Sequence, residues 1–152
     1  MSDAIDLERF VLAQNDGDAY ATARTEIRDG EKRSHWIWFV FPQVAGLGSS
    51  AMSRAYSITG LDEARAFLAH PVLGRRLHEI TELVNERASR SAREIFHGDD
   101  VKFHSCMTLF SLAAPQDAVF RAALDLFFDG KRDQRTESIL AAASTTRRAG
   151  SP

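Results

Sequence analysis

The six apolar residues Trp36-Ile37-Trp38-Phe39-Val40-Phe41, closed by Pro42, form the stretch on which the fold class of this chain depends. A buried strand and a buried helix look alike at this length. The aromatic and β-branched side chains favour a strand. The sequence has no second strand-like run, however, and a lone strand would leave its backbone hydrogen-bonding groups without partners. We therefore predict a helix over residues 36–41, with Ser34 as its candidate N-cap.

On both sides of this run, apolar residues recur at the three- and four-residue spacing that is typical of amphipathic helices. Gly30 is placed to end one of them, as glycine commonly does. The prediction is an all-α fold, a single compact multihelical domain of about eight helices over residues 6–143. The polar residues 144–152 have nothing to bury, and we expect them to form a disordered tail. The expected helices cover residues 6–14, 19–29, 36–41, 61–69, 71–87, 91–96, 99–113, 117–128 and 137–143, with Asp133 as an alternative start for the last one.

The composition excludes several classes of protein. A length of 152 residues fits one domain better than two. A net charge of −2 excludes a broadly basic surface, so we expect no nucleic-acid partner. The chain has no run of about 20 apolar residues for a membrane span and no apolar signal core, so we expect a cytoplasmic protein. A single cysteine excludes an internal disulfide and a multi-cysteine metal site, and we expect neither a metal nor a cofactor.

The segment Lys32-Arg33-Ser34-His35-Trp36-Ile37-Trp38 is a first candidate for binding chemistry. Three potentially cationic side chains adjoin two tryptophans, and cations beside aromatic faces suit planar anionic ligands. Cations at the start of a helix also favour a nearby anion, because the helix dipole is positive there. The alternative is that the tryptophans are core residues and the cations are solvated or paired with neighbouring acids. Composition alone favours this alternative.

The loop over residues 42–50 is a second candidate. It carries Gly46 and Gly48 and offers Ser49 and Ser50 as donors to an anion. It lacks the third glycine of a dinucleotide fingerprint and has no Gly-Lys-Ser/Thr sequence. An ordinary loop between helices is therefore the favoured interpretation.

A third candidate lies in the segment 97–106. On a helix, Asp100 and His104 are one turn apart, and His97 stands close enough in sequence to join them in a metal site. Acidic residues in a first turn also complement the helix dipole, and this explanation is favoured.

Lys102 and Cys106 lie on the same expected helix. Lys102 is either a partly desolvated lysine beside a polar surface or the ion-pair partner of Asp99, three residues earlier, and the pair is favoured. Cys106 follows an apolar stripe, so we expect a buried structural thiol.

Five segments carry a resemblance to a known family: residues 10–14, 32–43, 46–50, 70–77 and 102–110. Together they resemble a bacterial family catalogued as a domain of unknown function, some of whose members have been mislabelled calpastatin. The resemblance spans about residues 6–140 and implies an all-helical fold. It implies no accepted activity, cofactor or catalytic residue. Serine is usual in the family where this chain has Cys106, which argues against thiol chemistry.

These segments lead us to predict a polar and aromatic pocket between helices that binds a small anionic or nucleotide-like ligand. Polar side chains among core aromatics are costly to bury without partners, and a ligand pocket is one place where they occur. The cations would supply charge, a tryptophan a stacking face, and the amide and hydroxyl groups hydrogen bonds. The candidate ligand-binding residues are Lys32, Arg33, His35, Trp36, Trp38, Gln43, Lys102, His104 and Ser105.

Two other functions stay open. The first is a hydrolase that acts on a nucleotide-derived substrate at the same pocket, with Lys102, His104 or His35 as acid or base. The second is a protein-interaction module, which would have a flat apolar patch involving Phe127 or Phe128 in place of a pocket. The sequence determines neither whether the chain is an enzyme nor its oligomeric state.

Overall fold

The decisive apolar run forms one short helix, α3 (Ile37–Val40), in the computed structural model of this chain. The structure describes residues 6–149, with side chains within residues 6–143. The predicted helix is confirmed, although it is shorter than expected. Ser34 does not cap it: Trp36 is the N-cap residue and forms no side-chain cap bond. Ser34 instead donates to the buried carboxylate of Glu26, a charged acceptor that the cap position cannot match.

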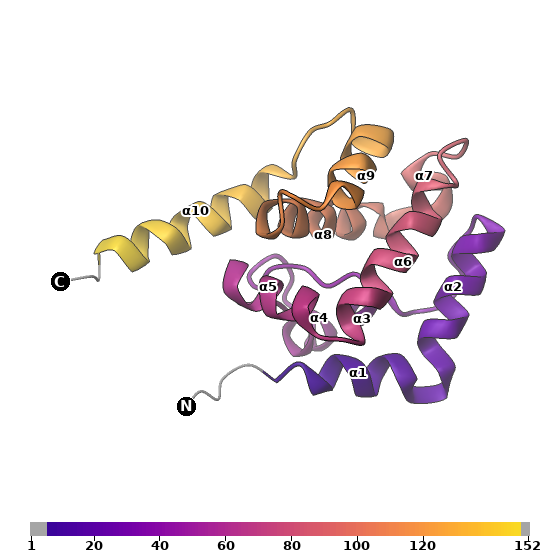
Figure 1. Ribbon diagram of the computed structural model, residues 1–152, viewed down its shortest axis with the longest axis horizontal. Coiled ribbons are helices and arrows are strands. Elements are labelled where there is room, and N and C mark those ends of the chain that lie inside the picture. Colours follow the sequence, from indigo (N-terminus) through magenta and orange to yellow (C-terminus); the bar gives the residue numbers. More distant parts are fainter. Residues whose placement is uncertain (1–5, 150–152) are drawn as a thin grey trace.

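The all-α, single-domain prediction is confirmed (Figure 1). Within the described residues, the one β-type pairing is an isolated parallel bridge between Val44 and Ile58. Three of the α-helices have five residues or fewer; two of them match the predicted segments 36–41 and 91–96, and the third, over residues 51–55, was not predicted. The order of helices is α1 (Glu8–Asn15), α2 (Ala19–Asp29), α3, α4 (Ala51–Ala55), α5 (Leu61–Ala69), α6 (Leu73–Asn85), α7 (Ala92–Phe96), α8 (Asp100–Ala113), α9 (Ala118–Phe128) and α10 (Gln134–Ala149), with short 3₁₀ turns at Asp16–Asp18 and His97–Asp99.

Several helix ends follow local signals in the sequence. Gly30 ends α2 with a φ of 88°, a left-handed conformation that a Cβ atom disfavours. Ser91 and Glu94 form a capping box at the start of α7, in which each side chain accepts from the other residue's backbone N–H. The side chain of Asp117 accepts a hydrogen bond at the start of α9. These ends are therefore fixed by residues within one turn of them.

Two helix starts depend on a side chain that accepts backbone hydrogen bonds. Helix α6 begins at Leu73, because the ring of His70 accepts backbone hydrogen bonds in the turn that precedes it. Helix α10 begins at Gln134, next to the alternative start that the sequence offered at Asp133, and the Asp133 carboxylate accepts from the backbone N–H of Thr136. Its helical backbone continues to Ala149, six residues into the segment for which we expect disorder. That expectation stays a prediction, and residues 150–152 lie outside the described part.

Helix α8 lies at the centre of the core, and helices α5, α7, α9 and α10 pack against it (Figure 1). Phe103 on α8 stacks on Phe96 with ring centroids 4.5 Å apart and meets Phe41 edge to face at 5.2 Å. Cys106 is fully buried on the same helix, so the predicted burial of its thiol is confirmed. No helix among the described residues is both long and apolar enough to cross a membrane.

Candidate functional site

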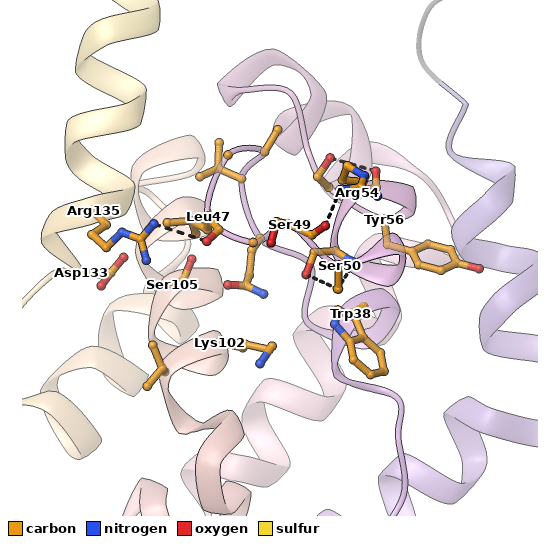
Figure 2. A pocket seen from close by; sticks show the side chains of 18 residues that line it. Trp38, Leu47, Ser49, Ser50, Arg54, Tyr56, Lys102, Ser105, Asp133 and Arg135 are labelled. Carbon is orange, nitrogen blue, oxygen red and sulfur yellow. Dashed lines mark hydrogen bonds between the residues drawn. The ribbon is translucent and has the colours of Figure 1, made fainter.

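The structure contains a cavity of about 500 Å³ between α8, the beginning of α10 and the loop that leads from α3 to α5 (Figure 2). We call it the loop cavity. Val44 and Ile58 hold the two ends of the loop together, with the Ala45 N–H donating to the Ile58 carbonyl at 2.8 Å. The volume falls within the range of small-molecule sites, and the walls come from three separate parts of the chain.

Four of the predicted ligand-binding residues line the loop cavity: Trp38, Gln43, Lys102 and Ser105. The Lys102 side chain is 33% exposed at the cavity wall. Ser105 is buried at the wall. In the view of Figure 2, Trp38 and Lys102 lie toward one end of the cavity, and Ser105 lies on another side. The structure thus brings Trp38, from the candidate segment 32–38, to the same cavity as Lys102 and Ser105, from the segment 97–106.

Lys32 and Trp36 do not line the loop cavity. Trp36 is 1% exposed, so it cannot offer a stacking face, and the core alternative holds for this residue. Lys32 is also buried; its ammonium lies 2.9 Å from the Asp99 carboxylate and 5.0 Å from the Trp36 ring centroid. A buried lysine needs such a partner. The hypothesis that these two side chains contact a ligand in the loop cavity was therefore wrong.

The carboxylate of Glu26 explains why this segment turns inward. It accepts hydrogen bonds from the backbone N–H groups of Arg33 and Ser34, from the Ser34 hydroxyl and from the Trp36 indole N–H, all between 2.5 and 2.9 Å. Burial alone would raise the pKa of Glu26, but these four donors lower it to about 2. A charged side chain that is 6% exposed thereby becomes the anchor of residues 33–36.

Asp99 connects this buried segment to the loop cavity. One carboxylate oxygen lies 2.9 Å from the Lys32 ammonium, and the other lies 3.2 Å from the Lys102 ammonium. Partial burial raises the pKa of Asp99, but the two lysines lower it more, Lys32 first, so the net shift is downward. The favoured pairing of Lys102 with Asp99 is confirmed.

Arg33, His35 and His104 lie elsewhere. Arg33 is exposed and pairs with Asp29 on α2 at 3.4 Å, and His35 is exposed. The ring of His104 stacks on Phe128 at 3.9 Å, and its Nε2 lies 2.8 Å from the Lys131 carbonyl oxygen. These three side chains do not line the loop cavity, because tertiary packing separates them from Trp38 and Lys102.

The histidines and acids of the segment 97–106 do not assemble into a metal site. His97 pairs with Glu31 at 3.0 Å, whereas His104 faces the backbone at residue 131. Among the described residues, no three His, Cys, Asp or Glu side chains gather closely enough to hold a metal ion.

Sequence reasoning missed Arg54, Tyr56, Asp133 and Arg135, which also line the loop cavity. Arg54 donates to the carbonyl of Ser49, and Arg135 donates to that of Leu47 at 3.3 Å (Figure 2). Both arginines thus hold the glycine-containing loop that the sequence offered as a weak anion-binding candidate. No local pattern marks Arg54 or Arg135, since they reach the cavity only through packing.

A chain of buried hydroxyl groups fixes the wall that carries Asp133 and Arg135. The Ser105 and Thr136 hydroxyl oxygens are 3.0 Å apart, and the Thr136 hydroxyl donates to Asp133 at 2.6 Å. The backbone N–H of Asp133 donates to the Thr108 hydroxyl at 2.9 Å. Every hydroxyl in this chain has a partner, so the start of α10 is held rigidly against α8.

The charge of the loop cavity differs from that of the whole chain. Its lining contains three cations, Arg54, Lys102 and Arg135, against the single carboxylate of Asp133. Because the chain as a whole carries a charge of −2, this excess of cations is local. The cavity therefore suits an anionic ligand with an apolar or aromatic part.

Comparison with known proteins identifies the family. The family model described as a protein of unknown function, DUF1810, matches residues 4–140. The chain belongs to this family. It is also similar to the crystal structure of the conserved hypothetical protein Rv1873 from Mycobacterium tuberculosis, with 48% sequence identity and a TM-score of 0.88 over 91% of this chain and 99% of that one. No curated protein matches it. The resemblance to a family of unknown function is thus confirmed.

Two segments that carry the resemblance to DUF1810 have structural roles. Residues 33–36 wrap the carboxylate of Glu26, and Ser105 and Thr108 dock the start of α10. Both contacts fix a part of the loop cavity. Residues 33–36 directly precede Trp38, and the start of α10 carries Arg135. These segments act on the cavity mainly by shaping it.

Proposed function

We propose that the chain binds a small, nucleotide-like organic anion in the loop cavity. The observation that carries the proposal is the meeting of three cations with two half-buried aromatic rings, Trp38 and Tyr56, in one cavity of small-molecule size. Ligand sites of this kind combine an apolar surface with a few convergent polar groups. A nucleotide presents the matching pair of features, a planar base and a phosphate.

The aromatic part of the ligand is expected at Trp38. This side chain is half-buried, and it lines the cavity together with Lys102 (Figure 2). A planar ring stacked on the indole would gain apolar contact, and the amide of Gln43 can exchange hydrogen bonds with a base edge. The nearby ammonium adds an electrostatic preference for an anionic ligand.

The anionic part is expected toward Arg135 and Arg54. Their guanidinium groups donate to loop carbonyls, which are neutral acceptors. A phosphate would replace a neutral acceptor by a charged one, and charge-assisted hydrogen bonds are about twice as strong. The hydroxyls of Ser49, Ser50 and Ser53 lie along the same loop as further donors.

Isothermal titration with AMP, ADP and ADP-ribose tests the proposal, with adenosine as the uncharged comparison. We expect a phosphate-bearing ligand to bind more tightly than adenosine. At about a hundred times its Kd, it should stabilise the fold by about 2.7 kcal/mol, which is readily seen as a higher Tm.

Variants then locate the binding site. Lys102→Met and Trp38→Ala should each weaken binding by about tenfold or more. Lys131→Met is the matched control, because Lys131 is exposed and lies outside the loop cavity. Equal weakening in the control, or no binding of any member of the series, would overturn the proposal.

A hydrolase would require a group in the cavity that activates water. Asp133 is the carboxylate in that place, but its Oδ2 already accepts from both the backbone N–H and the hydroxyl of Thr136. Binding is therefore the function we propose. Chromatography of ADP-ribose after incubation with the protein tests the alternative, since a hydrolase would release a new product and a binding protein would return the ligand intact.

A further inference from the structure

A second cavity, of about 400 Å³, is lined by residues from the end of α1, the turn at Asp16–Asp18, α2 and α6. It shares no lining residue with the loop cavity. Its lining includes Arg24, Arg75 and Arg76, so we call it the arginine pocket. Three guanidinium groups repel one another unless acceptors surround them. The acceptors available to each guanidinium group therefore show whether the pocket has room for an anion.

Arg76 is held in place by its neighbours. Its Nη1 donates to the Gln14 side-chain oxygen at 3.1 Å, and the Gln14 amide nitrogen donates to the Phe39 carbonyl at 2.8 Å. Gln14 is buried, so this arrangement has little freedom. The guanidinium also lies over the Tyr20 ring, 4.9 Å from its centroid. Arg76 is thus preorganised, with the rest of its donors available to a ligand.

Arg24 and Arg75 have donors without acceptors. The Nε of Arg24 is buried and has no hydrogen-bond partner among the described residues; the nearest carboxylate oxygen, on Glu79, is 3.8 Å away. A buried donor of this kind normally has an acceptor, and its absence needs an explanation. The side chain of Arg75 is exposed at the pocket and makes no hydrogen bond or ion pair with another described residue.

The acids of the pocket do not fill this need. Glu79 Oε1 accepts a 2.7 Å hydrogen bond from the Tyr20 hydroxyl, whose single proton has the Arg76 carbonyl oxygen, 2.9 Å away, as its other acceptor. Burial and the neighbouring Glu79 raise the pKa of Tyr20, so the hydroxyl stays protonated and keeps this bond. Asp18 is exposed. Three guanidinium groups therefore share the pocket with two carboxylates, so its lining carries an excess of positive charge.

We propose that the arginine pocket is a second anion site, which binds a phosphate-type oxyanion, either free phosphate or the phosphate group of a small monoester. Guanidinium groups match the oxygens of phosphate with paired N–H donors, and several around one ligand give both charge and geometry. The site is independent of the ligand proposed for the loop cavity.

NMR of the ¹⁵N-labelled protein tests this site directly through the arginine Nε–Hε signals, titrated with inorganic phosphate at constant ionic strength. Arg24→Lys and Arg75→Gln assign the two signals. We expect both signals to shift saturably in the wild-type protein. We also expect Arg75→Gln to weaken phosphate binding by about tenfold, since it removes charged donors from an exposed position without disturbing the core.

Two controls separate the sites. Arg121→Gln removes an exposed arginine of α9 that lies outside both cavities, and Lys102→Met alters the loop cavity; both should bind phosphate at this site as the wild type does. The proposal is overturned if neither arginine signal shifts saturably, or if Lys102→Met rather than Arg75→Gln loses phosphate. Ribose 5-phosphate in parallel distinguishes the sources: tighter binding than free phosphate identifies an ester, and weaker binding identifies the free ion.

Discussion

Glu26 is the residue on which the first polar and aromatic segment depends. Its carboxylate gathers four donors from Arg33, Ser34 and Trp36, and each of these groups would otherwise be costly to bury. The same carboxylate thus pulls Trp36 into the core and leaves Trp38 at the cavity. One buried acid decides which of the two tryptophans can meet a ligand.

Glu26 should also make stability depend on pH in the acid range. Its pKa is about 2 in the folded chain against an ordinary 4.5, so its contribution is complete above about pH 4.5 and is lost as the pH falls toward 2. A difference of this size corresponds to about 3 kcal/mol. We expect Glu26→Gln to lower the free energy of unfolding by roughly 1–3 kcal/mol at pH 7 and to flatten its fall between pH 4.5 and 2.

Urea unfolding of both proteins across this pH range measures the effect. Glu82→Gln is the control, because Glu82 is exposed. A Glu26→Gln variant that keeps the wild-type slope with pH would contradict the assignment.

At the scale of elements, the turn between α5 and α6 leaves less room for a Cβ atom than any other glycine position among the described residues. A Cβ atom on Gly74 would lie 2.0 Å from the Leu68 carbonyl oxygen, which is backbone and cannot move aside cheaply. The His70 ring caps the same turn. The glycine is required here by space, since its φ lies outside the left-handed region. Two helices can therefore leave this turn only if residue 74 has no side chain.

Gly74→Ala should lower the free energy of unfolding by about 3 kcal/mol, the upper part of the range for overpacking. For a chain of this size, that corresponds to a fall in Tm of about 10 °C. Gly98→Ala is the matched control, because a Cβ there meets no atom within 4 Å. Thermal unfolding of the two variants compares them, and equal Tm values would show that the turn has room.

At the scale of the whole molecule, the loop cavity exists because distant parts of the chain meet. Residues 43–57, helix α8 and the start of α10 each contribute one wall. The hydroxyl chain through Ser105, Thr136 and Asp133 joins two of these walls. Stability and ligand binding should therefore be coupled at this contact.

Thr136→Val tests this coupling, since it keeps the shape of the side chain and removes its hydroxyl. It leaves the buried Ser105 hydroxyl without its partner, and we expect a loss of about 1–3 kcal/mol in unfolding free energy. Affinity for the best nucleotide ligand should fall in the same variant, because Arg135 loses its support. Ser138→Ala, exposed on the same helix, should change neither quantity. A Thr136→Val protein as stable as this control would show that the hydroxyl chain does not hold α10.

The sequence by itself determined the helical class, the single domain and most helix positions, including the helix at residues 36–41. These features depend on local properties: the spacing of apolar residues, capping groups such as Ser91, and glycines such as Gly30. The sequence also indicated four candidate ligand-binding residues that tertiary packing places at one cavity: Trp38, Gln43, Lys102 and Ser105.

The tertiary structure alone decided which polar residues are structural and which face a cavity. Lys32 and Trp36 looked like ligand groups in the sequence, but partners from α2 and the turn before α8 bury them. Arg54 and Arg135 carry no local signal and reach the loop cavity from opposite halves of the chain. The reason is physical: periodicity reports which face of a helix is buried, whereas a cavity depends on which helices meet and on the acceptor that each buried donor finds there.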